Sequence, residues 1–239
     1  NVAYGYGGAV FAEGSRGPRL ARCRVQYNAA RIVWQANYLG GQGAGLYSRT
    51  EVPARIEDSE VSWNSGESTA FHVPAVGAIE GPWEASRCSV TYHTNHFMAG
   101  FREVALVEDC EVRGNAFGIC GADVVRDSRI ENNSSGGLYV TRPSLATRCL
   151  IARNGDSGIL CQGAGASPAI VAASTIVSNA SAAECYGNLH LRLEDCRMAG
   201  NGGGSGAGMG FIEHVRCTIE GNGRVGSTSL GALDYNSCL

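Results

Sequence analysis

Apolar and polar positions recur in the same order from one end of the chain to the other. The repeated phrase is an apolar residue, two polar residues, Cys or Ser, any residue, Val or Ile, two variable residues and Asn, as in residues 107–115. From Cys88 onward the small residue returns every 18 to 25 residues, and the intervals are longer only in the N-terminal third. A sustained period of this length is typical of a solenoid. The small residues are Cys23, Ser59, Cys88, Cys110, Ser128, Cys149, Ser174, Cys196, Cys217 and Cys238.

Three further columns keep their register with this small residue. An apolar column lies two positions after it: Val25, Val61, Val90, Val112, Ile130, Ile151, Ile176, Met198 and Ile219. A second column lies three positions before it: Leu20, Ile56, Ala85, Val107, Val125, Ala146, Val171, Leu193, His214 and Tyr235. An asparagine column lies five positions after it: Asn28, Asn64, Asn115, Asn133, Asn154, Asn179, Asn201 and Asn222, with His93 as the exception. We interpret His93 as a substitute for Asn, in preference to a metal ligand.

Each interval predicts short strands and no helix, because a helix does not fit beside strand-length apolar alternation in so few residues. A further strand follows a Gly in residues 45–47, 118–120, 137–140 and 158–161. Three short strands per coil, each stacked on its counterpart, make a right-handed parallel β-helix. We therefore predict an all-β chain with a single β-helix domain over residues 1–239 and about ten coils. Inward asparagines at the bend satisfy buried backbone groups.

The asparagine column and the repeated Gly-apolar strand resemble the pectin-lyase-like superfamily of right-handed β-helices. The opening residues 7–10 and the strand ends that finish in Asn also resemble bacterial surface and autotransported β-helices. This resemblance covers nearly the whole length and implies the fold. It implies function less directly, because the fold carries lyases, hydrolases, epimerases, tailspikes and adhesins.

Composition narrows the chemistry that the chain can perform. All 19 basic residues are Arg, so no lysine Schiff base or lysine general base is available. A net charge of −3 gives no reason to expect nucleic acid as a partner. No apolar run is long enough to span a membrane, and we expect a secreted or cell-surface protein. The chain begins and stops inside a coil, so we expect a piece of a longer chain, whose missing parts cover the ends, or rods that associate end to end.

Seven of the ten cysteines occupy the single inward column. Stacked neighbours in such a column have Cβ atoms about 4.8 Å apart, slightly beyond the roughly 3.5 to 4.5 Å that a disulfide prefers. We therefore expect free thiols that fill the core. Metal binding by the column is the alternative, and the absence of a CxxC pair disfavours it.

Two surface columns permit both a structural and a functional interpretation. The residue before each Cys or Ser is charged in nearly every coil with mixed sign, as expected for ion pairs at a turn. Within it, Asp109 and Asp127, together with Glu108, are the candidates for a Ca²⁺ site. Tyr27, Trp63 and Tyr92 precede the ladder position in three consecutive coils. Such a stack is explained by packing, or by contact with sugar rings.

No catalytic signature of the resembled enzymes is present. The paired Asp motifs and Gly-His-Gly of β-helical polygalacturonases are missing, as is the Asp-Pro-His of alginate epimerases. Pectate lyases of this fold use an Arg base beside carboxylates that bind Ca²⁺. Arg19, Arg55 and Arg192 are candidates for such a base, and Glu84 is a further catalytic candidate. Whether the chain is an enzyme stays open; as an enzyme it would be a polysaccharide lyase or resemble a glycoside hydrolase. No cofactor other than Ca²⁺ is implied.

Three excursions interrupt the N-terminal coils, at residues 29–44, 72–82 and 94–103. We expect them to wall a groove over the first sheet that binds an acidic polysaccharide through Arg forks and aromatic faces. The function predicted is thus an extracellular carbohydrate-binding or carbohydrate-processing module; the alternative is a non-catalytic structural or adhesin solenoid of a bacterial surface. The expected contact residues are Arg19, Arg55, Glu57 and Glu84 from the sheet, with Trp34, Tyr38, His72, Trp83 and His96 from the loops or their margins.

Overall fold

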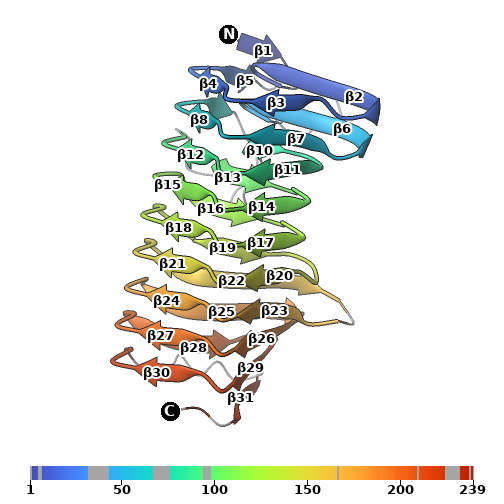
Figure 1. Cartoon of the computed structure of the whole chain (residues 1–239). Helices are drawn as coiled ribbons and strands as arrows, with labels where there is room; N and C mark the ends of the chain where they lie inside the picture. Colours follow the sequence, from blue (N-terminus) through green and yellow to red (C-terminus); the bar gives the residue numbers. More distant parts are fainter. Residues whose placement is uncertain are drawn as a thin grey trace. The chain divides into compact units, whose positions relative to one another are not determined.

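The computed structural model describes residues 2–4, 7–31, 43–66, 76–93, 98–165, 167–208, 210–223, 232–236 and 238. These residues contain β-strands and turns and no helix, which confirms the all-β prediction. The chain divides into two compact units, Asn1–Ala122 and Asp123–Leu239. No helix long and apolar enough to cross a membrane occurs in the described ranges. Within each unit the equivalent strands of successive turns lie side by side (Figure 1).

Unit 1 contains three long parallel sheets and one short one. The first sheet consists of β3 (Arg19–Ala21), β7 (Ala54–Glu57), β11 (Trp83–Ser86) and β14 (Leu106–Glu108). The second consists of β4 (Arg24–Gln26), β8 (Glu60–Ser62), β12 (Ser89–Thr91) and β15 (Glu111–Arg113). The third consists of β2 (Val10–Arg16), β6 (Leu46–Val52), β10 (Val76–Glu80), β13 (Met98–Arg102) and β16 (Phe117–Cys120). The short sheet joins β1 (Val2–Tyr4), β5 (Ala29–Arg31) and β9 (Ser65–Gly66).

Unit 2 repeats the three-sheet arrangement. Its first sheet consists of β17 (Val124–Arg126), β20 (Leu145–Thr147), β23 (Ala169–Ala172), β26 (His190–Glu194), β29 (Phe211–Val215) and β31 (Ala232–Asn236). Its second consists of β18 (Arg129–Glu131), β21 (Leu150–Ala152), β24 (Thr175–Val177), β27 (Arg197–Ala199) and β30 (Thr218–Glu220). Its third consists of β19 (Leu138–Val140), β22 (Ser157–Ala164), β25 (Ser181–Asn188) and β28 (Gly203–Ala207).

The predicted number of about ten coils is too high. Counted over the described residues, unit 1 contains four complete three-strand turns, from β2 to β15, followed by β16. Unit 2 contains four more, from β17 to β28, followed by β29 to β31. The sequence phrase covers only the first two strands of a turn. A count of this phrase along the sequence therefore includes partial turns at the ends of the series.

Parallel, in-register pairing stacks like residues into the core. Val61 pairs with Val25 on one side and with Val90 on the other, and Ile176 pairs with Ile151 and Met198. All six are buried. Fully burying an aliphatic side chain of this size stabilises a fold by about 1.5 to 3 kcal/mol. The apolar columns of the sequence are thus the interior of each unit.

Two corners of every turn use the left-handed backbone conformation. The first corner joins the first and second sheets at Arg22, Asp58, Arg87, Asp109, Asp127, Arg148, Ala173, Asp195 and Arg216, with φ between 48° and 53°. The second corner joins the second and third sheets at Tyr27, Trp63, Tyr92, Gly114, Asn132, Arg153, Ser178, Gly200 and Gly221, with φ between 53° and 67°. For residues other than Gly this conformation costs roughly 1 to 2 kcal/mol. Only Asn and Asp offset part of this cost by local hydrogen bonds.

Ala173 offers a direct test of the strain at the first corner. Its φ is 48° and its methyl group is exposed, so removing the methyl forfeits no packing. We expect Ala173→Gly to raise the free energy of unfolding by about 1 kcal/mol, measured by urea denaturation. Ala172→Gly, one residue earlier in β23, should instead lower it by about 0.5 to 1 kcal/mol. Destabilisation by both substitutions would contradict a strained corner.

Buried asparagines form a continuous hydrogen-bond ladder behind the second corner in each unit. In unit 2, the Asn154 Oδ1 accepts from the Asn133 backbone N–H at 3.1 Å and from the Asn133 Nδ2 at 3.0 Å. The Asn154 Nδ2 donates in turn to the Ile130 carbonyl at 3.2 Å. The same pattern links Asn179 to Asn201. Each side chain thus satisfies backbone groups that the corner leaves without a strand partner.

His93 takes the place of an asparagine in this ladder. Its Nδ1 accepts from the Asn64 backbone N–H at 3.1 Å, and its Nε2 lies 3.1 Å from the Val61 carbonyl, to which it donates. This arrangement requires the neutral ring with the proton on Nε2. Burial accordingly lowers the pKa of His93 to about 4. The interpretation of His93 as a substitute for Asn agrees with these bonds.

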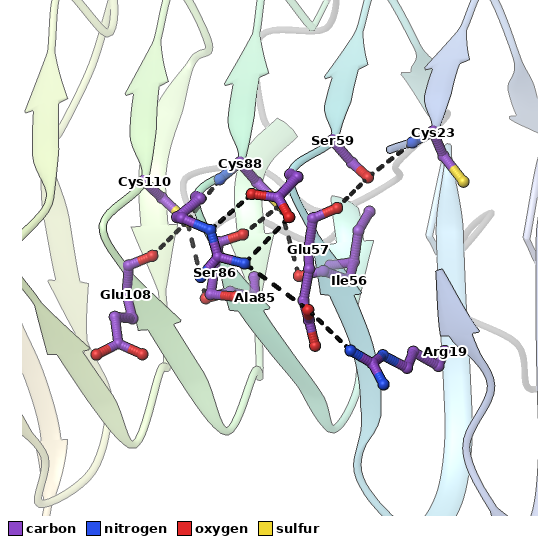
Figure 2. Close-up of polar contacts among 12 residues, drawn as sticks. Arg19, Cys23, Ile56, Glu57, Ser59, Ala85, Ser86, Cys88, Glu108 and Cys110 are labelled. Carbon is purple, nitrogen blue, oxygen red and sulfur yellow. Dashed lines mark hydrogen bonds and ion pairs between the residues drawn. The ribbon is translucent and has the colours of Figure 1, made fainter. Parts of the chain in front are cut away.

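All ten cysteines are free thiols, as predicted. Their sulfurs bond mainly to backbone carbonyls two residues earlier, such as Cys110 to Glu108 at 3.1 Å and Cys88 to Ser86 at 3.2 Å. Figure 2 shows this column in unit 1, where Ser59 also accepts from the Cys23 backbone N–H at 3.0 Å. Eight thiols are buried, and only Cys23 and Cys238 are partly exposed. The column acts as small apolar filler at the first corner.

Candidate functional site

The outer face of the unit 1 first sheet brings four predicted contact residues together. The register places Arg55 between Arg19 and Glu84, and Glu57 lies two residues after Arg55 on β7. The Arg55 Nε donates to Glu84 at 2.8 Å. The Arg19 NH2 donates to Glu57 at 3.2 Å (Figure 2). Both guanidinium groups are thus already engaged by protein carboxylates, so a glycan carboxylate would have to displace them.

A small depression lies on this strip, and the neighbouring tryptophan does not reach it. The depression has a volume of about 120 Å³ and is lined by Arg55, Glu57, Glu84, Ala85, Ser86, Leu106 and Glu108. Trp83, which we expected at the ligand, is completely buried. Trp83 and Ala85 point inward from β11, whereas Glu84 between them points outward. Trp83 therefore packs in the core and offers no face to a sugar.

Each of the three long excursions returns to the solenoid at a third-sheet strand, and the expected groove over the first sheet stays a prediction. Residues 32–42 separate β5 from β6, residues 67–75 separate β9 from β10, and residues 94–97 separate β12 from β13. Each excursion therefore precedes a third-sheet strand. The buried Glu80 carboxylate accepts from the backbone N–H groups of Gly43 at 2.9 Å and Gly77 at 3.0 Å, where two excursions return to the sheet.

Four of the expected contact residues lie outside the described residues. They are Trp34, Tyr38, His72 and His96. They stay predicted contact residues.

The second corner of unit 1 carries three large aromatic residues, which we call the aromatic ridge: Tyr27, Trp63 and Tyr92. Their side chains are 71%, 43% and 38% exposed. The Trp63 and Tyr92 rings stack with centroids 4.9 Å apart and planes inclined by 14°. Because the rings cover each other's faces, ring edges dominate the surface that this pair presents. The ridge arises in the same three turns that carry excursions.

Neighbouring groups hold the end of the ridge in place. The Arg113 guanidinium carbon lies 5.4 Å from the centroid of the Tyr92 ring, and its NH1 donates to the Tyr92 hydroxyl at 3.1 Å. A Cβ on Gly114 would lie 2.6 Å from the Tyr92 Cδ1, so the next turn accommodates this ring only with glycine at the corner. Arg113 and Gly114 therefore hold the Tyr92 ring in its position.

Polar side chains of the second sheet run beside the ridge. Gln26 Nε2 donates to Glu60 at 2.7 Å and to the Ser62 hydroxyl at 2.8 Å. The Ser62 hydroxyl donates to Glu60 at 2.9 Å, and Arg24 pairs with Glu60 at 3.0 Å. These bonds, that from Ser62 above all, lower the pKa of the Glu60 carboxyl. An apolar ridge beside a row of fixed donors and acceptors matches the two kinds of surface of a sugar.

The mixed-charge column forms ion pairs at the first corner, as expected of a structural ladder. Arg87 donates two hydrogen bonds to the Asp58 carboxylate, of 2.6 and 3.1 Å. In unit 2, Arg148 donates two to the Asp127 carboxylate, of 2.7 and 2.6 Å. The Arg148 guanidinium lowers the pKa of the Asp127 carboxyl. The metal candidates Glu108, Asp109 and Asp127 do not form a cluster: in the described part of the chain no three His, Cys, Asp or Glu side chains are placed to hold a metal ion.

The sequence contains a signal that distinguishes the second corner of these three turns. An aromatic residue precedes the ladder position only in the turns that carry a long excursion, whereas Gly, Asn, Arg or Ser stands there elsewhere. Arg113 was also missed as a partner of the ridge. Its role depends on a neighbour one full turn away, which the spacing of the repeat reveals only once the strands are correctly assigned.

No curated protein matches this chain by sequence. A crystal structure of a double mutant of the periplasmic alginate epimerase AlgG superposes with a TM-score of 0.58 at 10% identity, covering 100% of this chain and 77% of that one. Another AlgG crystal structure gives 0.48 at 8% identity, covering 98% and 76%. The family model "Right handed beta helix region" matches residues 76–226, well over half of the chain. The chain therefore belongs to the right-handed β-helix family.

Proposed function

We propose that this chain binds a polysaccharide along the second corner of unit 1, with the aromatic ridge as its apolar contact. One observation carries the proposal. Tyr27, Trp63 and Tyr92 are exposed and adopt φ of 55°, 54° and 58°, where a bulky residue is an outlier. In all the remaining turns of the described residues, this corner holds Gly, Asn, Arg or Ser. Partial exposure offsets little of the backbone cost, so the aromatic choice is better explained by an external contact.

The surroundings of the ridge suit a carbohydrate. Sugar C–H groups pack against aromatic surface, while sugar hydroxyls need both donors and acceptors. Gln26, Glu60 and Arg113 carry such groups within one or a few residues of the ridge, and a sugar hydroxyl would share them with their present protein partners. A glycan running from turn to turn would meet an exposed aromatic residue in three successive turns. Such repetition fits a polymer better than a small molecule.

The structural comparison supports this class of ligand and a location outside the cytoplasm. The AlgG structure that shares the fold is named a periplasmic alginate epimerase, which is a protein that acts on a polysaccharide. At 10% identity the likeness concerns the fold. We extend to this chain only the class of ligand and a periplasmic or extracellular location. The first-sheet strip of Arg19, Arg55, Glu57 and Glu84 is the competing surface for the same ligand.

Replacing Trp63 tests the proposal without disturbing the backbone. Trp63→Asn removes the ring and leaves a residue that tolerates the left-handed conformation. We expect affinity for a bound oligosaccharide to fall by roughly thirtyfold, as for an aromatic residue at the centre of a binding surface. The melting temperature should change little, because the relief of backbone strain offsets the loss of the stack on Tyr92. Isothermal titration calorimetry against neutral and acidic oligosaccharides measures the first quantity, and differential scanning calorimetry the second.

Two comparison variants make the result specific. Ser178→Asn changes the equivalent corner position in unit 2 and should leave affinity unchanged. Arg55→Ala removes the central guanidinium of the first-sheet strip and should also leave it unchanged. If Arg55→Ala abolishes binding while Trp63→Asn does not, the first sheet is the site and the second corner is not. If the wild-type protein binds no oligosaccharide at millimolar concentration, carbohydrate binding itself is wrong.

A further inference from the structure

A second cavity lies at the first corner of unit 1, on the other edge of the second sheet. We call it the arginine depression. Its volume is about 670 Å³, which falls within the range of roughly 300 to 1,000 Å³ usual for ligand sites. It shares Arg24 and Glu60 with the polar residues beside the aromatic ridge, and no residue of the first-sheet strip lines it. Its lining residues are Arg22, Cys23, Arg24, Asp58, Ser59, Glu60, Arg87 and Ser89.

The residues that line the depression carry three guanidinium groups and two carboxylates, and Glu57, outside the lining, pairs with Arg87 at 3.7 Å. Arg87 is held by Asp58 in a two-bond fork, and Arg24 pairs with Glu60 at 3.0 Å. Arg22 is exposed, and no ion pair joins it to another of the described residues, although its charge contributes to lowering the pKa of Asp58. The guanidinium of Arg22 therefore remains available.

The depression also contains a regular row of corner residues and a neutral hydrogen-bond donor. Arg22, Asp58 and Arg87 occupy the same left-handed corner position in successive turns, with φ of 53°, 49° and 51°. They therefore form one row at the corner, one residue in each turn. The Ser89 hydroxyl lines the cavity and makes no hydrogen bond to the described residues, so it can donate to a ligand. The Ser59 hydroxyl is occupied, because it donates to the Glu57 carbonyl at 2.6 Å.

We propose that the arginine depression binds an oxyanion of the polysaccharide, either a uronic carboxylate or a sulfate ester. This inference rests on the proposed function and names the class of polysaccharide, an acidic one. A guanidinium donates two parallel hydrogen bonds to either group, and Arg22 is placed to do so. From Arg24 to Tyr27 the chain advances three residues, about 10 Å in extended conformation. One oligosaccharide can therefore place an acidic group in the depression while its rings contact the aromatic ridge.

Cys23 provides a reporter inside the depression. Its thiol is partly exposed and lines the cavity, whereas Cys238 is partly exposed in unit 2 and the other eight thiols are buried. Alkylation by iodoacetamide, followed by peptide mass spectrometry, gives the labelling rate of each thiol separately. With an acidic oligosaccharide at about ten times Kd, we expect labelling of Cys23 to slow about tenfold, because only unliganded molecules react. Labelling of Cys238 should not change.

The ligands are used in three arms of equal chain length: a neutral, a uronic and a sulfated oligosaccharide. Protection of Cys23 by the uronic or the sulfated arm, and not by the neutral arm, supports the inference and identifies the oxyanion. Binding of acidic oligosaccharides without protection of Cys23 overturns the inference, while the proposed function stands. Failure of all three arms to bind in calorimetry overturns the proposed function as well.

A charge-matched pair of variants completes the test. Arg22→Gln should weaken binding of the protecting oligosaccharide by about tenfold or more, as expected for loss of a hydrogen bond to a charged group. The melting temperature should not change, since Arg22 forms no ion pair within the described residues. Arg16→Gln removes the same charge at an exposed position on β2, outside the depression, and should leave binding unchanged. Equal weakening by both variants would mean that overall charge, and not this cavity, attracts the ligand.

Discussion

Asn154→Ala should lower the free energy of unfolding by about 4 kcal/mol, the largest change we expect from any single substitution in this chain. The side chain of Asn154 accepts two hydrogen bonds from Asn133 and donates to the Ile130 carbonyl and to Asn179 Oδ1, all of them buried. Alanine replaces none of these bonds. Each buried group left without a partner costs roughly 1 to 3 kcal/mol, and three such groups are left.

Urea denaturation followed by circular dichroism measures this change, and a neighbouring asparagine serves as the control. Asn132 lies at the exposed corner position with φ of 56°, outside the ladder. Asn132→Gly keeps the left-handed conformation and should change stability by no more than about 0.5 kcal/mol. If Asn154→Ala also costs less than about 1 kcal/mol, the ladder does not hold the second corner in place.

Acidification should destabilise unit 1 through His93. The pKa of His93 is about 4 in the folded protein, against 6.5 for a free histidine, because burial disfavours the charged ring. Between these two values the unfolded chain binds a proton that the folded chain does not. Stability contributed by the neutral ring is therefore complete above pH 6.5 and is lost as the pH falls. The loss is about 1.4 kcal/mol per pH unit and about 3 kcal/mol by pH 4.

The variant His93→Asn isolates this effect. Asparagine supplies the same acceptor and donor, as Asn115 does when its Nδ2 donates to the Val90 carbonyl at 3.2 Å, and it does not titrate. The stabilities of the two proteins should therefore differ progressively below pH 6.5, with the wild type the less stable. Paired carboxylates such as Asp58, whose pKa the Arg87 guanidinium lowers, titrate equally in both proteins and cancel. Parallel pH profiles would show that His93 is not buried as a neutral group.

The interior of the molecule was predictable from the sequence because it obeys a short-range rule. Strand alternation with a fixed period assigns residues such as Val61, Ile176 and Asn154 to inward columns without knowledge of any contact. The same rule identified His93 as an asparagine substitute and the seven cysteines of the inward column as free filler. Applied to β11, it would also have placed Trp83 inward, two residues before inward Ala85. The expectation of Trp83 at a loop margin is wrong for this reason.

The outer surface depended on which corner of the turn each insertion occupies. The length of an excursion is visible in the sequence, but its corner depends on which flanking segment becomes the third strand. Residues 29–31 and 65–66 form a separate short sheet before the first two excursions. The repeated phrase does not reveal these extra strands. The ion pairs of Arg55 with Glu84 and of Arg87 with Asp58, and the stacking of Trp63 on Tyr92, join residues 29 positions apart. The sequence by itself determined which residues face inward, because alternation is local. Only the tertiary structure decided which outward residues meet, because that depends on the register between turns of unequal length.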